Sequence, residues 1–203
     1  MRKLTLSILA SAAVAFATPA LAAPMIFTSP GPVQPTSNVL FQSGATTGNP
    51  VTGSLNDSSA LVNFTSNESL NVTQSNGQAR ISGTDGDLTN LVISLTSGFT
   101  FSAIEFNLNA LANGSATLTF AGADGISSVF PISLNGQNFF SATGNFTSVT
   151  INSTVQLGDV RQVRITAGPG GVPEPATWAM MLIGFGAAGY SLRRRKAVAL
   201  QAA

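Results

Sequence analysis

The sequence predicts an all-β protein, an antiparallel β-sandwich of jelly-roll type, with a helical targeting segment at each end. The middle of the 203-residue chain is rich in Ser, Thr, Asn and Gly and alternates apolar with polar residues in short runs. Such alternation is typical of strands with one buried and one solvated face. Turn-forming pairs such as Asn135-Gly136 separate the runs. Both chain ends instead combine a long apolar stretch with basic residues, as targeting and membrane segments do.

The first 22 residues have the composition of a secretory signal peptide. Two basic residues precede the mostly apolar run 4–16, and Ala20-Leu21-Ala22 supplies small residues for a signal peptidase. We expect cleavage after Ala22 rather than after Ala23, because the second cut would leave a proline at the start of the mature chain. The alternative is an uncleaved N-terminal anchor.

Residues 23–37 are expected to form a Pro-rich leader, since three prolines within 26–37 oppose pairing in the middle of a sheet.

The β-sandwich domain is placed at 38–167, and no part of it has the period of an amphipathic helix. The alternating apolar residues occupy odd positions up to Phe101 and even positions from Ile104 onward. This change predicts a bulge or turn near Ser102. The strands are expected at 38–42, 60–65, 70–74, 79–83, 90–97, 104–110, 116–120, 128–134, 137–142, 146–153 and 163–167.

Side-chain parity gives two further expectations for this domain. Phe139 and Phe140 are adjacent on a strand, so only one of them can face the core. Arg161 and Arg164 have an odd spacing, which places them on opposite faces of a regular strand, with Arg161 pointing inward or to the rim. An inward Arg161 near Asp159 or Glu105 is expected to form a structural ion pair.

The C-terminal segment has three parts in a fixed order. Residues 168–175 form a Gly/Pro linker that ends in Pro173-Glu174-Pro175, which two prolines hold extended. The 17 apolar residues 176–192 would span about 25 Å as a transmembrane helix. The tail 193–203 begins with four cations, Arg193, Arg194, Arg195 and Lys196, which are expected to stay in the cytoplasm. The alternative, a helix buried in the folded body, does not explain this order.

The segment Val-Pro-Glu-Pro-Ala-Thr-Trp-Ala-Met-Met-Leu-Ile-Gly-Phe-Gly at 172–186, followed by the cations, resembles the PEP-CTERM sorting signal of Gram-negative bacteria in its PEPxxWA form. Parts of the body, 99–107 and 159–165, also resemble other small secreted PEP-CTERM proteins. The residues that carry the sorting motif are Val172, Pro173, Glu174, Pro175, Trp178 and Ala179.

The resemblance implies a destination and a partner. An exosortase, a transpeptidase-like membrane protease, would process the chain near Pro-Glu-Pro. The protein would cross the inner membrane, be anchored transiently or permanently, and then reach the cell surface or an extracellular exopolysaccharide and biofilm matrix. The expected partners are therefore a signal peptidase, an exosortase, the membrane and exopolysaccharide. The resemblance makes this chain a substrate of the protease and not the enzyme.

Composition excludes several functions. The chain has no Cys and no His, which excludes thiol catalysis, Ser-His-Asp triads and Cys- or His-ligated zinc. Between Pro24 and Val172 there are three basic and seven acidic residues, a net charge of −4. An acidic body repels nucleic-acid phosphates, so no nucleic-acid partner is expected. No cofactor is expected either.

Acidic residues supply the remaining candidates for chemistry. The segments Asp85-Gly86-Asp87 and Asp124-Gly125 are expected to form Asx-type turns. The alternative is that Asp85, Asp87 and Asp124 bind calcium. Glu105 lies on the polar side of a strand, where a solvated position explains it as well as a role in glycoside hydrolysis does. The expected function is thus a non-enzymatic structural or adhesive one, followed by glycan binding, with calcium as a possible aid, and then by a carboxylate-dependent glycosidase.

Overall fold

A computed structural model describes residues 24–28, 33–41, 46–75, 78–122, 125–169, 180–187 and 189. These residues form twelve strands and a short helix at 180–187, so the all-β expectation is confirmed. Every strand pairing in the described part of the chain is antiparallel. The strands are β1 (Met25–Thr28), β2 (Ser37–Leu40), β3 (Thr46–Gly48), β4 (Val51–Leu55), β5 (Leu61–Thr65), β6 (Leu70–Ser75), β7 (Gln78–Gly83), β8 (Leu88–Leu95), β9 (Phe99–Ala110), β10 (Gly114–Gly122), β11 (Ser127–Leu134) and β12 (Gln137–Pro169).

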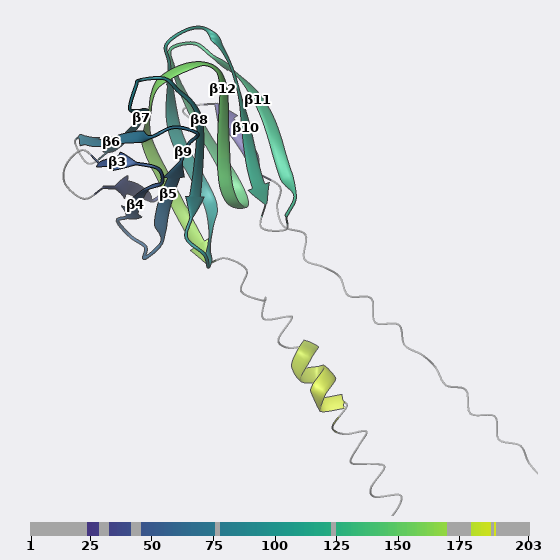
Figure 1. Ribbon diagram of the computed structural model, residues 1–203. Helices are drawn as coiled ribbons and strands as arrows, with labels where there is room; N and C mark the ends of the chain where they lie inside the picture. Colours follow the sequence, from purple (N-terminus) through teal and green to yellow (C-terminus); the bar gives the residue numbers. More distant parts are fainter. Residues whose placement is uncertain are drawn as a thin grey trace, which may run out of the picture.

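The last strand, β12, has 33 residues and organises the whole body (Figure 1). Its first part, 137–143, pairs with β1 and β9; its middle part, 146–153, pairs with β8 and β10; and its last part, from 157, returns to β9. β12 therefore passes from one layer of strands to the other and back. The first change of layer is at Gly144, where φ is 148° and an added Cβ would meet Pro24 Cα at 2.8 Å.

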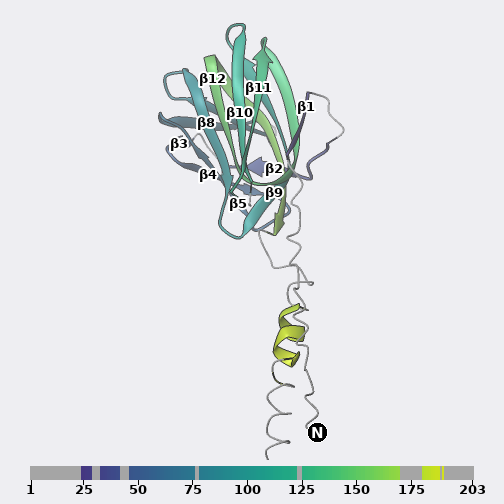
Figure 2. The same cartoon turned by 90° about the vertical axis from the view of Figure 1, so that its right-hand side faces the viewer.

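The strands lie in two layers that β12 joins (Figure 2). The β8 layer contains β11, β10, the middle of β12, β8, β5 and β4 in this order. The β9 layer contains β1, the first part of β12, β9, the last part of β12, β7, β6 and β3. The short strand β2 pairs with both β4 and β12, so it connects the two layers at one side.

Aromatic side chains fill the space between the layers. Phe101 of β9 stacks on Phe146 of β12 with ring centroids 5.0 Å apart, and Phe120 of β10 meets Phe146 edge-on at 5.0 Å. All three side chains are fully buried. The alternating pattern explains this core, because every second residue of each strand points to the same side. Phe140 is buried in the same core and Phe139 lies on the opposite face, so the expectation that only one of them is buried is confirmed.

The structure also differs from the expected strand list. β1 lies inside the predicted leader, where it pairs with 140–143 of β12 as an edge strand that avoids the prolines. The segments predicted as separate strands at 137–142, 146–153 and 163–167 are one bent strand. The predicted bulge near Ser102 is confirmed, because Phe101 and Ala103 pair with the adjacent residues Ala167 and Thr166, which leaves Ser102 as the extra residue.

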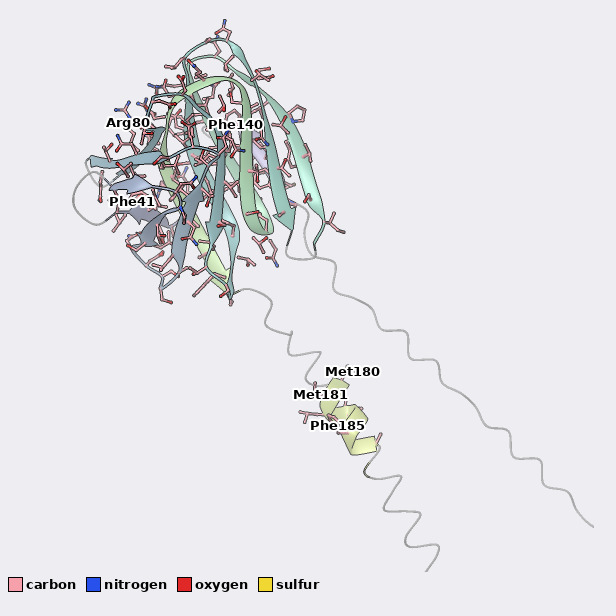
Figure 3. The ribbon with its side chains drawn as sticks, in the orientation of Figure 1. Phe41, Arg80, Phe140, Met180, Met181 and Phe185 are labelled. Atoms are coloured by element: carbon pink, nitrogen blue, oxygen red, sulfur yellow. The ribbon has the colours of Figure 1, made fainter. Side chains whose placement is uncertain are left out.

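The helix at 180–187 exposes its large apolar side chains. Met180, Met181 and Phe185 are 46%, 57% and 71% exposed, and Figure 3 shows them outside the β-body. Within the described residues, no helix has the length and apolar character needed to cross a bilayer. The predicted span 176–192 is therefore not shown, and the signal peptide predicted at 1–22 lies outside the described residues.

Candidate functional site

All three basic side chains of the β-body and two of its acidic side chains gather on the outer face of the β9 layer. Residues directly opposite each other in an antiparallel pair share a face of the sheet, and the pairing places Asp159, Arg161 and Arg164 of β12 opposite Asn109, Asn107 and Glu105 of β9. On the other side of β9 the same three residues oppose Gln137, Phe139 and Ser141. Arg80 of β7 lies opposite Arg161 and is seen beside β7 in Figure 3. We call this surface the β9 face; it consists of Arg80, Glu105, Asn107, Asn109, Gln137, Phe139, Ser141, Asp159, Arg161 and Arg164.

A buried carboxylate joins two of its arginines. Asp159 is 2% exposed, and its Oδ2 accepts hydrogen bonds from Arg80 Nε at 2.8 Å and from Arg161 Nη2 at 3.0 Å. Arg161 Nε lies 2.5 Å from Asp159 Oδ1, and Asn109 Nδ2 adds a longer contact of 3.5 Å to Oδ2. The side chains of Arg80 and Arg161 are 53% and 25% exposed, so the cations reach solvent while the carboxylate does not.

Arg164 is held more loosely at the other end of the face. Its Nη1 lies 4.0 Å from Glu105 Oε1 and 3.5 Å from Gln34 Oε1. The expectation that Arg161 and Arg164 occupy opposite faces is wrong. Gln162 between them has a positive φ of 55°, and the register shifts there, so a bulge restores both arginines to the same face. The expected structural ion pair of Arg161 does form with Asp159, but on the outer side, and Glu105 lies near Arg164 instead.

Amide side chains fill the centre of the β9 face. Asn107 Nδ2 donates to Gln137 Oε1 at 3.4 Å and to Gln162 Oε1 at 3.3 Å, from both neighbouring parts of β12. Asn107 is 1% exposed, and its Oδ1 has no hydrogen-bond partner among the described residues. Ser141, also 1% exposed, leaves its Oγ without a partner in the same part of the chain. Buried polar atoms normally have hydrogen-bond partners, so two buried acceptors without one on the same β9 face are unusual.

Two phenylalanine rings border the amides. Phe139 is half-buried opposite Asn107. Phe27 of β1 is half-buried opposite Ser141. The β9 face therefore combines aromatic rings, amide groups and arginines, which are the side chains that recognise hydroxyl-bearing and anionic ligands.

The predicted calcium residues form a turn. The backbone N–H of Asp87 donates to Asp85 Oδ1 at 3.0 Å, and Gly86 has φ of 88°, which is the geometry expected of an Asx-type turn. Asp124 lies outside the described residues. Among the residues that the structure describes, no group of three or more Asp and Glu side chains has an arrangement that could hold a metal ion.

Glu68 and Asp85 lie against each other over Gly83. An added Cβ on Gly83 would meet Glu68 Oε2 at 2.5 Å and Asp85 Oδ1 at 3.0 Å. Burial raises the pKa of Glu68, and a hydrogen bond with Asp85 and the charges of Asp85 and Asp87 raise it further. The hydrogen bond from Asp87, followed by that from Glu68, lowers the pKa of Asp85. Of the two carboxyl groups, Glu68 is therefore the one that keeps its proton to higher pH and can donate it in the hydrogen bond with Asp85.

This pair predicts a stability change with pH. Because the folded state raises the pKa of Glu68 above its ordinary value of about 4.5, this group stabilises the fold below that pH and loses that contribution as pH rises through the raised value. Glu68→Gln keeps a donor for Asp85 at every pH, so its stability relative to the native chain should increase between pH 4 and pH 7. Denaturant unfolding across this range measures the difference. Asp57→Asn, an exposed change in the loop before β5, should show no such increase; equal behaviour of the two variants would contradict the assignment.

The sorting residues predicted from the sequence, from Val172 to Ala179 and from Arg193 to Lys196, lie outside the described residues, as do Ala20, Ala22 and Ala23. Comparison with protein families nevertheless tests the C-terminal motif. The family described as "PEP-CTERM protein-sorting motif" matches residues 171–196. The chain carries a PEP-CTERM sorting motif. The match begins two residues after the end of β12 at Pro169, so the PEP-CTERM segment directly follows the folded body.

The β-body ahead of the PEP-CTERM segment has only distant structural similarity. A mutant of the carbohydrate-binding module CBM29-2 shares 13% identity and a TM-score of 0.34 over 66% of this chain and 99% of its own. A structure described as carbohydrate binding module family 29 shares 14% identity and a TM-score of 0.34, over 71% of this chain and 97% of its own. The enzymatically active domain of bacteriophage CBA120 tailspike protein 4 shares 13% identity and a TM-score of 0.24, over 72% of this chain and 19% of its own. Values this low establish neither a shared fold nor a shared ligand. A comparison with curated proteins finds no match.

The sequence alone indicates single residues of the β9 face but not the face itself. It indicates Glu105 as an acid and, with Asp159, as an ion-pair partner of Arg161, but it does not bring Asn107, Asn109 and Gln137 together with them. The polar residues at alternate positions of β9 mark one side of the strand, but this pattern does not distinguish a solvated side from a covered one. Asn107 is instead buried, and the side chains of Gln137 and Gln162, from the two flanking parts of β12, contact its amide.

Proposed function

We propose that this protein is exported from a Gram-negative bacterium and sorted by its PEP-CTERM segment to the cell surface. There it serves as a non-enzymatic structural or adhesive component of the envelope or the exopolysaccharide and biofilm matrix. A signal peptidase removes 1–22, the apolar stretch 176–192 halts transfer in the membrane, and the cations from Arg193 to Lys196 stay inside. An exosortase then cuts near Pro173-Glu174-Pro175.

One observation supports this proposal above the others. The folded body ends with β12 at Pro169, and the PEP-CTERM match begins at residue 171. No strand of the described body has to open for a protease to reach the motif, because the last strand is complete before it. The two prolines around Glu174 favour an extended backbone, the form in which a protease binds its substrate.

The test is mass spectrometry of the exported protein from a bacterium that encodes an exosortase. We expect the mature native chain to end near Pro173-Glu174-Pro175 and to lack 176–203. Glu174→Ala should accumulate with its C-terminal segment retained, whereas Asp57→Ala, which changes an exposed acid of the body, should be processed normally. If 176–203 remains on the native exported protein, a permanent anchor replaces the processing step.

Glycan binding by the body is a second candidate function, and the β9 face favours it. The half-buried ring of Phe139 lies opposite the buried Asn107, with the amides of Gln137 and Gln162 on either side. Glycan sites need an apolar surface beside a few placed polar groups. A surface protein that binds matrix polysaccharide in this way would also be adhesive, so the two candidates are compatible.

A further inference from the structure

We propose that the β9 face binds an acidic polysaccharide, one whose sugars carry carboxylates, across β9 from Phe139 to Arg164. This inference rests on the glycan-binding candidate and specifies its place and its ligand class. Three features of the face carry it: its charge, the unused donors of its arginines, and its buried acceptors.

Basic and acidic residues are distributed unevenly over the surface of the body. All three basic residues between Pro24 and Pro169 are arginines of the β9 face, where they accompany only Asp159 and Glu105. The face therefore carries a net charge of +1 in a body of net charge −4. A positive surface on an acidic body attracts an anionic ligand to that surface and repels it elsewhere.

The arginines keep donors available for such a ligand. A guanidinium has five N–H donors, and a carboxylate binds two of them side by side. Arg80 and Arg161 share the single carboxylate of Asp159, and both remain partly exposed, by 53% and 25%. Arg164 is 32% exposed, and its contacts with Glu105 at 4.0 Å and Gln34 at 3.5 Å are long. Arg164 is therefore the cation best placed to exchange its present contacts for a ligand carboxylate.

The acceptors on the face indicate hydroxyl groups beside the carboxylate. Asn107 Oδ1 and Ser141 Oγ are buried and without a partner among the described residues. The Gln137 and Gln162 amides that contact Asn107 do so at 3.4 and 3.3 Å, so both bonds are long enough to be replaced. Because Asn107 Oδ1 is buried, a sugar ring on Phe139 would have to displace these two amides before its hydroxyl donors could reach that atom. A free inorganic anion would use the arginines and leave Asn107 and Phe139 unused.

The opposite surface of the body provides an internal control. β4, β5, β8, β10, β11 and the middle part of β12 contain no charged residue. The outer side of this layer offers small polar side chains and the exposed Val129, which is 58% accessible. A variant at Val129 therefore changes an exposed side chain without altering the charge of either face.

The experiment measures binding of the full-length protein, purified in detergent, to polygalacturonate and to neutral dextran by affinity electrophoresis. We expect retardation by polygalacturonate, weaker at high salt, and little or none by dextran. Phe139→Ala and Arg164→Gln should each weaken binding by about tenfold, and Val129→Ala should leave it unchanged. Far-UV circular dichroism establishes that each variant is folded.

Three results would overturn the inference in different ways. Equal retardation by dextran would reject the acidic ligand class and leave glycan binding in place. Equal weakening by Val129→Ala would reject the β9 face as the site. Retardation by neither polymer would reject both the inference and the glycan-binding candidate, while sorting through the PEP-CTERM segment would still be decided by mass spectrometry.

Discussion

Phe146→Ala is expected to lower the free energy of unfolding by about 3–5 kcal/mol. Phe146 is fully buried, and its ring lies 5.0 Å from those of Phe101 and Phe120. These contacts connect the middle of β12 with β9 in one direction and with β10 in the other. Removing the ring leaves a cavity between the two layers, because rings held by separate strands cannot all move in to fill it. Denaturant unfolding followed by far-UV circular dichroism measures the loss.

Phe139→Ala is the matched control for this prediction. It removes the same side chain from the same strand, but Phe139 is half-buried on the outer face. Its truncation should cost about 1 kcal/mol, since only part of the ring is removed from water on folding. A similar cost for the two variants would contradict the assignment of Phe146 to the centre of the core.

The sequence was sufficient to predict the features that depend on neighbouring residues. The alternation of apolar and polar residues predicted most strands, because successive side chains of a strand point to opposite faces. For the same reason it predicted that only one of Phe139 and Phe140 faces the core. The sorting motif was also predictable, since the order of Pro-Glu-Pro, an apolar stretch and cations is contiguous in the chain. Its match at 171–196 agrees with that prediction.

Features that depend on distant pairing were not predictable. Gly144 lies in a pair that is typical of turns, yet β12 continues through it into the other layer. The alternation of residues predicted Arg161 on the inner face of β12. The bulge at Gln162 interrupts this alternation, so Arg161 lies on the outer face. The β9 face exists because β12 flanks β9 twice and β7 brings Arg80 next to Arg161, 81 positions along the chain. No local pattern of residues contains this information.

Asp159→Ala is expected to lower the free energy of unfolding by about 3 kcal/mol. The carboxylate is 2% exposed and is the common partner of Arg80 and Arg161. Its removal leaves two neighbouring guanidinium groups facing each other across paired positions of β7 and β12. Both cations are partly exposed and can regain water, which keeps the cost at the lower end of the range for a broken buried ion pair. The same unfolding measurement applies.

Glu105→Gln tests whether burial and pairing, rather than charge alone, cause this effect. Glu105 is the other acid of the β9 face, but its single arginine contact is 4.0 Å long, so the change should cost less than about 1 kcal/mol. The cost of Asp159→Ala should also persist in about 1 M salt, because a buried carboxylate is screened far less than an exposed one. If salt abolishes the difference between the native chain and Asp159→Ala, Asp159 is a solvated charge in solution. The β9 face would then lack the fixed carboxylate that holds Arg80 and Arg161 in place for an anionic ligand.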